Sequence, residues 1–263
     1  VALVVEELTD TVGYKVSGRG ELHLSILIEK MRREGYEFQV TRPRVILKET
    51  NEGKLEPYEE LTIDVDEQYS GKVIENLGKR KGSMIEMHHH NGMVRMLYRI
   101  PTRGLIGFRS EFMTETKGMG TMSYIFDGYD KYAGEMRNRN NGALVVMEEC
   151  STVAYALFNL QERGQLFLGP GERVYGGQII GEHSRENDIV VNPAKGKKLT
   201  NMRAAGSDDA VILTPFRKMS LEDCISYINE DELVEITPLS IRLRKAILDE
   251  TQRKRAKIAA AKA

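Results

Sequence analysis

The sequence predicts an α+β fold: two ferredoxin-like βαββαβ modules, the first truncated, followed by a mainly β C-terminal module with appended helices. Over residues 58–129, apolar residues alternate with a period of two or recur at helical spacing, in βαββαβ order. The second half of the same pattern precedes it within residues 1–41. After Tyr132, short β-branched segments are separated by glycine turns, which is typical of a mainly β module.

The first module, residues 1–50, reads as strand, strand, helix and strand. The expected elements are strands at Val1–Glu7 and Tyr14–Ser17, a helix at Gly20–Glu34 and a strand at Phe38–Thr41. Gly35 is placed to end the helix, and Pro43 interrupts the last strand. The first strand and helix of a split βαβ unit have no counterpart, so this module is expected to be truncated.

The second module, residues 51–132, follows a polar connector at 44–57. The expected strands are Glu60–Asp66, Ser83–Met87, Val94–Ile100 and Gly120–Gly128, and the expected helices run from a cap at Ser70 to about Gly82 and over Leu105–Thr116. Every second residue from Val94 onward is apolar, which predicts one buried face.

The third module, residues 133–263, is expected to start with a linker at Gly134–Gly142 and to form a compact β module such as a small barrel. The expected strands are Leu144–Met147, Val153–Phe158, Leu166–Leu168, Gln178–Ile180, Ile189–Val191 and Val211–Leu213, and the expected helices are Leu221–Ile228 behind a Ser220 cap and Pro238–Leu248 behind Thr237. From residue 242 onward, eight Lys and Arg oppose two Asp and Glu, and this basic tail is expected to fray.

Composition narrows the class of protein. The 263 residues are 41% hydrophobic and 29% charged, as in a globular chain of two or three domains. The net charge is −1, so contact with nucleic acid must come from local basic patches. Cys150 and Cys224 form neither a disulfide framework nor a paired metal motif. No apolar run reaches the ~18 residues of a membrane span, so we expect a cytoplasmic protein without membrane contact.

The sequence contains no nucleotide-binding loop of the GxxxxGK[ST] type, which cradles phosphates with backbone N–H groups and a lysine. The Gly-Lys pair at 71–72 is followed by Val73, and the pair at 196–197 has Val191 where a glycine is required. The chain also opens at Val1 inside an apolar run. We therefore expect the C-terminal portion of a larger protein, with no enzymatic activity and no cofactor of its own.

The most unusual segment is Asn192–Ser207, with the sequence NPAKGKKLTNMRAAGS. It has four cations and no acidic residue, and its glycines and proline discourage a regular element. Irregular loops of this length inside a compact module are often functional, and these side chains suit contacts with phosphate and sugar. The candidate RNA-binding residues are Lys195, Lys197, Lys198, Asn201 and Arg203. The alternative is a solvated loop without a ligand.

A second basic group, Lys79–Lys81, lies at the end of the first helix of the second module. Lys79, Arg80 and Lys81 are candidate contacts for an RNA backbone, although cations at a helix C-terminus are also favourable for structural reasons alone. Adjacent histidines at 88–90 alternate across a strand, so they cannot converge on one ion and no metal site is expected. No residue spacing specifies catalysis.

Three stretches resemble translational GTPases of the elongation-factor-G-like family. SGRGELHLSILIEKMRREGYEF (residues 17–38) resembles the end of domain III, and RIPTRGLIGFRSEFMTETKGMG (residues 99–120) resembles domain V. GERVYGGQIIGEHSRENDIVVNPAKGKKLTNMRAAGSDDA (residues 171–210) resembles the C-terminal domain of the BipA (TypA) family, which elongation factor G lacks. The resemblance divides the chain into a partial domain III (1–50), a domain V (51–132) and a family-specific C-terminal domain (133–263).

This resemblance implies a factor that binds the 70S ribosome at the elongation-factor site and acts in stress adaptation and ribosome assembly. It implies that the C-terminal loop approaches the acceptor arm of the A-site tRNA and the peptidyl-transferase region of the 23S rRNA. By position, Lys195, Lys197, Lys198, Asn201 and Arg203 would make these contacts. In that family GTP and Mg²⁺ are bound by an N-terminal domain without a counterpart here. The chain is expected to be a monomer.

A second class of function stays open at this point, a protein-binding adaptor. In that alternative the ferredoxin-like sheets dock protein partners and the loop has no RNA contact. Because RNA binding weakens steeply with salt, ribosome co-sedimentation at graded salt distinguishes the two functions.

Overall fold

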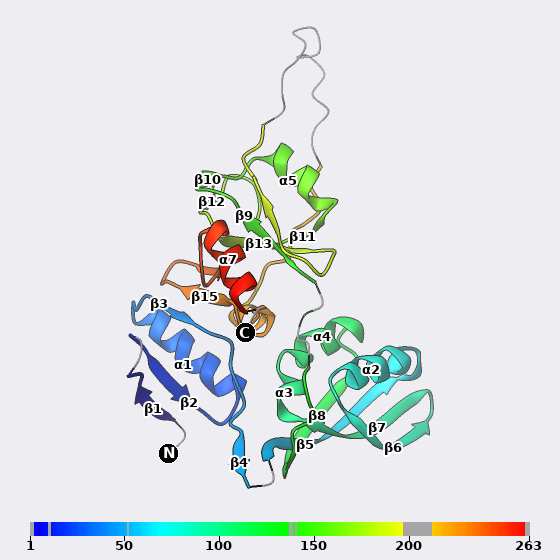
Figure 1. The fold of residues 1–263 in the computed structure, drawn as a ribbon. Coiled ribbons are helices and arrows are strands. Elements are labelled where there is room, and N and C mark those ends of the chain that lie inside the picture. Colours follow the sequence, from blue (N-terminus) through cyan, green and yellow to red (C-terminus); the bar gives the residue numbers. More distant parts are fainter. Residues whose placement is uncertain are drawn as a thin grey trace. The chain divides into compact units, whose positions relative to one another are not determined.

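The computed structural model describes residues 3–9, 12–51, 53–136, 139, 141–196 and 212–260. Their contacts group them into two compact units, both drawn in Figure 1: a contiguous unit, Pro43–Asn138, and a discontinuous unit made of Val1–Arg42 and Arg139–Ala263. No helix in the described ranges is long and apolar enough to cross a membrane. The three-part division predicted above follows resemblance rather than contact, and it stays a prediction.

The contiguous unit is a complete βαββαβ module, as predicted for residues 58–129. Its elements are β4 (Lys48–Thr50), β5 (Gly53–Asp66), α2 (Glu67–Lys79), β6 (Ser83–His90), β7 (Met93–Pro101), α3 (Thr102–Leu105), α4 (Phe108–Glu115) and β8 (Thr121–Lys131). The four long strands are antiparallel in the order β8-β5-β7-β6, and the short β4 pairs with the start of β5.

The predicted alternation in the central strands decides which face of this sheet is buried. The core side chains of β5 and β7 are Leu61, Ile63, Val65, Val94, Met96, Tyr98 and Ile100. They share one core with residues of all three helices, so α2, α3 and α4 cover the same face. On the other face, Arg95 forms a bidentate ion pair with Asp64, with N···O distances of 2.7 and 2.9 Å.

Two expectations for this unit are wrong in detail. The segment 44–57 is not a plain connector, because it forms the β4–β5 hairpin, with Gly53 at a φ of 127° next to the turn. The first helix is capped by Asp66 instead of Ser70. The Asp66 carboxylate accepts a hydrogen bond from the backbone N–H of Gln68 at 3.1 Å, so the helix starts one turn earlier.

The helix predicted over Leu105–Thr116 is divided into α3 and α4. Gly107 lies between them with a φ of 72°, a left-handed conformation that a helix interior cannot contain. The spacing of apolar residues alone did not reveal this break, because Leu105, Phe108 and Phe112 are still buried in one core.

The discontinuous unit contains the remaining elements. They are β1 (Val4–Glu7), β2 (Tyr14–Ser17), α1 (Glu21–Arg33), β3 (Phe38–Val40), β9 (Ala143–Val146), β10 (Cys150–Ser151), α5 (Ala154–Gln161), β11 (Gly164–Leu166), β12 (Arg173–Val174), β13 (Gln178–His183), β14 (Ile189–Val191), α6 (Leu221–Tyr227), β15 (Glu232–Ile236), β16 (Ile241–Lys245) and α7 (Glu250–Ala260). The elements expected within residues 1–41 are confirmed for the described residues, with the first strand starting at Val4.

One large sheet organises this unit, in the order β14-β9-β13-β16-β15-β3, with β11 beside β13. Only the β14–β9 pair is parallel among the described pairs of this sheet. β3 is its edge strand and pairs with β15, while α1 contacts α6. The Ser226 hydroxyl donates a hydrogen bond to the Glu21 carboxylate at 2.7 Å. The two segments of the discontinuous unit therefore pack directly on each other.

Both faces of the central strands are buried. In β9, Ala143 and Val145 belong to a core with α6, whereas Leu144 and Val146 belong to a second core with α5. Cys224 lies in the first of these cores, and burial raises the pKa of its thiol to about 12. A sheet covered on both faces has continuous apolar strands, which explains the unbroken run Ala143–Val146.

Two sequence predictions are overturned in this unit. Val153–Phe158 was expected to be a strand, but α5 occupies most of it because Ala156, Leu157 and Leu160 form one buried helical face. Pro238–Leu248 was expected to be a helix, but it forms the turn after β15 and the strand β16.

The Thr237-Pro238 signal marks a turn instead of a helix start. The backbone N–H of Thr237 donates to the Ser240 carbonyl at 2.9 Å, and the Thr237 hydroxyl oxygen accepts from the Ser240 N–H at 3.0 Å. The residues that follow alternate, with Leu243 and Lys245 buried.

Other expectations have mixed outcomes. The predicted Ser220 capping box of α6 is confirmed, with reciprocal hydrogen bonds to Asp223. The basic tail, expected to fray, forms α7 as far as Ala260. Of the strand predicted at Val211–Leu213, the first residue lies outside the described residues, and the other two are irregular.

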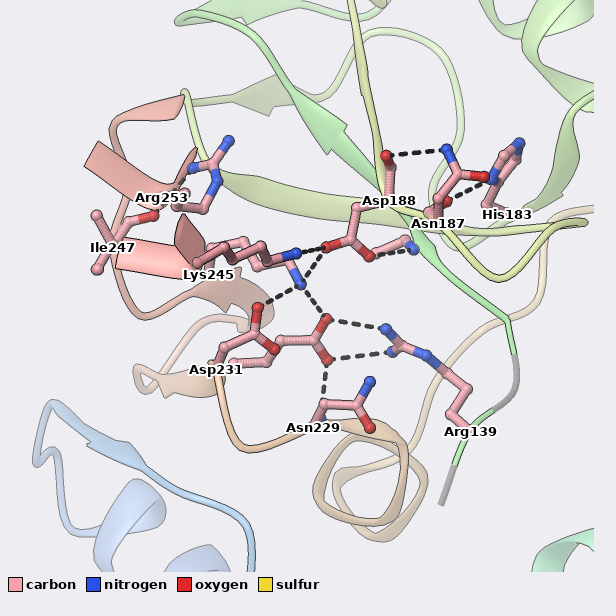
Figure 2. A network of polar contacts seen from close by, with 12 residues as sticks. Arg139, His183, Asn187, Asp188, Asn229, Asp231, Lys245, Ile247 and Arg253 are labelled. Carbon is pink, nitrogen blue, oxygen red and sulfur yellow. Dashed lines mark hydrogen bonds and ion pairs between the residues drawn. The ribbon is translucent and has the colours of Figure 1, made fainter. Parts of the chain in front are cut away.

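A buried cluster of charges holds this unit together (Figure 2); we call it the Lys245 network. It consists of Arg139, Asp188, Asp231, Glu232 and Lys245. The Lys245 ammonium, 2% exposed, lies 2.8 Å from the Asp188 carboxylate, 3.1 Å from that of Asp231 and 2.7 Å from that of Glu232.

The network joins four parts of the unit. Glu232 of β15 is fully buried and also pairs with Arg139 at 2.9 Å. Asp188 lies just before β14 and accepts a hydrogen bond from the backbone N–H of Ala143 at 2.9 Å. The network therefore connects β16 and β15 with the starts of β9 and β14.

The network also shifts the pKa values of its members. Burial disfavours the charged form of Lys245, but the charge of Glu232 and the hydrogen bonds to Asp188 and Glu232 outweigh it, so the pKa of Lys245 is raised. Burial alone would raise the pKa of Asp188, yet the hydrogen bond from Lys245 and its charge lower it below the usual value.

Replacing Lys245→Met should lower the free energy of unfolding by about 3–5 kcal/mol, because it removes the buried cation that Asp188 and Glu232 share. Urea denaturation of the full chain at neutral pH measures this. Lys257→Met is the matched control, since Lys257 also faces Asp188, at 3.5 Å, but is 66% exposed. The control should cost no more than about 1 kcal/mol. Equal stability of the two variants would contradict the assigned role.

The stability difference between the wild type and Lys245→Met should depend on pH. The pKa of Asp188 is lower in the folded than in the unfolded protein. Its contribution to the free energy of unfolding is therefore complete above the unfolded pKa of about 3.9 and is lost as pH falls through the folded pKa. Because the folded pKa of Lys245 is raised, its contribution is complete below about 10.4 and is lost as pH rises through the folded value. Denaturation at several pH values should show a constant difference between about pH 5 and 9 that shrinks below about pH 4. An undiminished difference at about pH 3 would contradict this account.

Candidate nucleic-acid interface

The basic loop predicted at Asn192–Ser207 is only partly described. Lys197, Lys198, Asn201 and Arg203 lie outside the described residues. Lys195 is described, and it is exposed. The structure therefore defines where the loop leaves the unit and where the chain rejoins it.

The chain leaves through a hydrogen-bonded stem. β14 runs parallel to β9, and the backbone N–H of Met147 donates to the Val191 carbonyl at 3.0 Å. The N–H of Val153 donates to the Pro193 carbonyl at 2.9 Å. The Asn192 side chain then accepts a hydrogen bond from the N–H of Ala194 at 2.9 Å, which forms a local turn directly before Lys195.

The returning chain is held by α5 and β11. The Gln161 side chain donates to the Thr214 carbonyl at 2.8 Å and accepts from the Thr214 N–H at 3.3 Å. Beyond it, the N–H of Arg217 donates to the Leu166 carbonyl at 2.9 Å. The start of the basic segment and the stretch after it, Thr214–Arg217, are thus both hydrogen-bonded to the same part of the unit, around α5.

The second predicted cluster, in the contiguous unit, contains one anchored and two exposed side chains. The Arg80 guanidinium donates to the carbonyls of Gly104 and Ile106, at 2.8 and 3.1 Å, and pairs with Glu111 at 2.7 Å. Its side chain is only 18% exposed. This geometry explains Arg80 as a structural link between the end of α2 and the α3–α4 turn.

Lys79 and Lys81 face solvent. Lys79 forms an ion pair with Glu75, one helical turn earlier, at 2.6 Å, and Lys81 follows α2 with a φ of 61°. In the same unit, Arg99 pairs with Asp127 and Asp130, each at 2.6 Å. Lys79, Arg80 and Arg99 therefore each have their own acidic partner, and no described contact brings Lys79, Arg80 and Lys81 onto one ligand.

Sequence reasoning did not anticipate the cations that lie near Lys195. Arg163, after α5, and Arg253, Lys254 and Lys257 of α7 line the same hollow as Lys195. Residues 253, 254 and 257 recur at helical spacing, a signal that was visible in the sequence but was attributed to a fraying tail. Only folding brings Arg163 next to them.

Within the described residues, no group of three or more His, Cys, Asp and Glu side chains could hold a metal ion. The adjacent histidines of β6 have separate acidic neighbours: His88 lies 3.2 Å from Glu86, and His89 lies 3.5 Å from Glu67.

Comparison with known proteins matches both parts of this architecture. A family model described as the elongation factor G C-terminus matches residues 53–140, and one described as the TypA/BipA C-terminal domain matches residues 141–250. The chain is 57% identical to the large ribosomal subunit assembly factor BipA of Salmonella typhimurium over 258 residues, and 56% identical to that of Escherichia coli K12. The protein of the same name from Buchnera aphidicola is 53% identical.

Each of these alignments covers 97% of this chain and 42% of the relative. The chain therefore spans less than half the length of the curated proteins it matches. Because both family models match in sequence order and more than half of the aligned residues are identical, the chain belongs to the BipA family.

Proposed function

We propose that this chain is the RNA-binding C-terminal part of a ribosome-associated factor, and that the loop at 192–207 is its main RNA contact. One observation supports this most directly. The chain is hydrogen-bonded around α5 both at the start of the basic segment, at 191–194, and beyond it, at 214–217, and the four cations of residues 192–207 lie between these two points. A basic loop with fixed ends can present its charges to a phosphate backbone with little loss of freedom.

Within this proposal, Lys195, Lys197 and Lys198 act as point charges on phosphates. Arg203 offers a planar fork to a phosphate, and the Asn201 amide suits a sugar or a base edge. Lys79 and Lys81 are candidates for a second, weaker contact from the contiguous unit. Arg80 holds the end of α2 in place and does not itself contact the RNA, because its guanidinium is already bound to Gly104 and Glu111.

The partners follow from the relatives, whose name describes assembly of the large ribosomal subunit. We propose the 70S ribosome as the partner of this chain, with 23S rRNA and the A-site tRNA as the RNA contacts. A cytoplasmic monomer acting in ribosome assembly and stress adaptation is part of the same proposal. Binding and hydrolysis of GTP with Mg²⁺ is assigned to the part of the relatives that this chain does not span.

Replacing Lys197, Lys198 and Arg203 together by alanine should weaken ribosome association and flatten its salt dependence by about 2 to 3 units of slope. Thermal melting should hardly change, because the variant alters no residue of the described hydrophobic cores. Co-sedimentation with 70S ribosomes at graded salt measures both the affinity and the slope.

A control variant, Lys15→Ala with Lys30→Ala and Lys131→Ala, removes three exposed cations away from the loop. It should keep the wild-type slope. If the loop variant also keeps the wild-type slope, the loop is a solvated connector. Ribosome binding that is insensitive to salt would favour the protein-binding adaptor instead.

The chain by itself should not bind GTP, because its sequence has no phosphate-cradling loop. Titration calorimetry with GTP and Mg²⁺ at neutral pH should give no specific heat, with ATP as the comparison nucleotide. Guanine-specific binding in the micromolar range would show that a nucleotide site has been missed.

A further inference from the structure

A hollow of about 970 Å³ lies between α5, β14 and α7 of the discontinuous unit, at the stem of the basic loop. We call it the α7 groove. Its basic side chains are Arg163, Lys195, Arg253, Lys254 and Lys257, and its acidic side chains are Glu162, Asp188 and Glu250. This volume is at the upper end of small-ligand sites and far larger than one phosphate requires.

One face of α7 supplies most of the charge. Residues 250, 253, 254 and 257 follow the i, i+3, i+4, i+7 spacing of a single helical face, and all of them line the groove. Arg255 is exposed on the same helix but does not line it. The cations therefore form a row along the helix, with Lys254 and Lys257 about 4.5 Å apart along its axis.

The three acidic side chains of the groove do not cancel its five cations, although Lys254 pairs with Glu250 and Lys257 with Asp188. Asp188 belongs to the Lys245 network and lies 2.8 Å from the Lys245 ammonium. Glu250 pairs with Lys254 at 2.6 Å in an exposed ion pair that contributes little. Arg163 and Lys195 are exposed, and neither side chain has an ion pair within the described residues. The groove is therefore left with a positive balance that favours an anionic ligand.

The groove is also partly apolar. Met147, Ile189 and Val190 line it beside the cations, and Met147 is 55% exposed. A row of cations next to an accessible apolar surface suits a chain of successive phosphates whose sugars or bases contact the apolar part. A compact anion would need cations that converge on one point.

We propose that the α7 groove binds a single-stranded RNA backbone, as a second contact beside the loop. This inference rests on the proposed function, because Lys195 belongs to both the groove and the loop. Because the groove continues into the basic loop, one RNA strand could contact both. An acidic protein segment could also neutralise the cations of the groove, but this continuity favours RNA. Lys254, Lys257 and Arg163 face the phosphates. Arg253 mainly anchors α7, since its guanidinium donates to the carbonyls of Ile247 and Leu248.

The test measures binding of a fluorescein-labelled uridine RNA of about ten nucleotides to the full chain, by anisotropy at graded salt. Lys254→Ala with Lys257→Ala should reduce the salt slope by about 1.4, the value for two phosphates of a single strand. Arg185→Ala with Arg255→Ala is the matched control, because it removes two exposed cations outside the groove. The control should keep the wild-type slope, and all variants should melt like the wild type.

The same pairs are then measured in the Lys197→Ala, Lys198→Ala, Arg203→Ala background. If the groove variant matches its control while the loop variant loses slope, the groove proposal is overturned and the proposed function stands. If the groove variant loses slope while the loop variant does not, the groove binds RNA and the loop does not. A wild-type chain without salt-dependent RNA binding would overturn both.

An acidic peptide probe separates the remaining alternative. Labelled polyglutamate of about ten residues should bind weakly and respond equally to the groove and control variants. If only polyglutamate binding is lost in the groove variant, the groove is a site for an acidic protein segment and the RNA proposal is wrong.

Discussion

The discontinuous unit depends on one constraint, the burial of the Lys245 ammonium among three carboxylates. A lone buried charge is strongly unfavourable, so Lys245 and Glu232 can occupy the interior only when their partners are in place. Those partners come from β15, from the turn before β14 and from Arg139, where the chain enters the unit. The two cations and three carboxylates of the network therefore link β16 and β15 to the starts of β9 and β14.

The candidate interface follows from that constraint. Asp188, which the network holds, is followed directly by β14, and β14 leads into the stem of the basic loop. The loop could be predicted from the sequence because four cations and no acidic residue occur within the sixteen residues 192–207. The α7 groove could not, since Arg163 and the face of α7 are about ninety residues apart and only tertiary packing joins them. The hydrogen bonds of Arg80 could not be predicted from the sequence either, because its partners lie on α3 and α4.

The fold itself was predictable where one face of a strand is exposed to solvent and the other is buried. In β7 the alternation of apolar and charged residues defines both the strand and its buried face. In the discontinuous unit this signal is weak, because strands such as β9 are covered on both sides and short helices are equally apolar. Tertiary packing decided that Val153–Phe158 contributes to α5. The Thr237-Pro238 pair was ambiguous for another reason, since a proline in the first helical position and a proline in a turn share the same φ.

The pairing of β3 with β15 has a consequence for the order of folding. Val40 lies opposite Val234, so almost two hundred residues separate partners in one sheet, and the whole contiguous unit lies between them in the chain. Contacts this distant in sequence form slowly, whereas Pro43–Asn138 closes its sheet from its own residues. During synthesis from the N-terminus, the inserted unit can fold as soon as it has left the ribosome. The segment before it must wait, with its edge strand β3 unpaired, until β15 has been made.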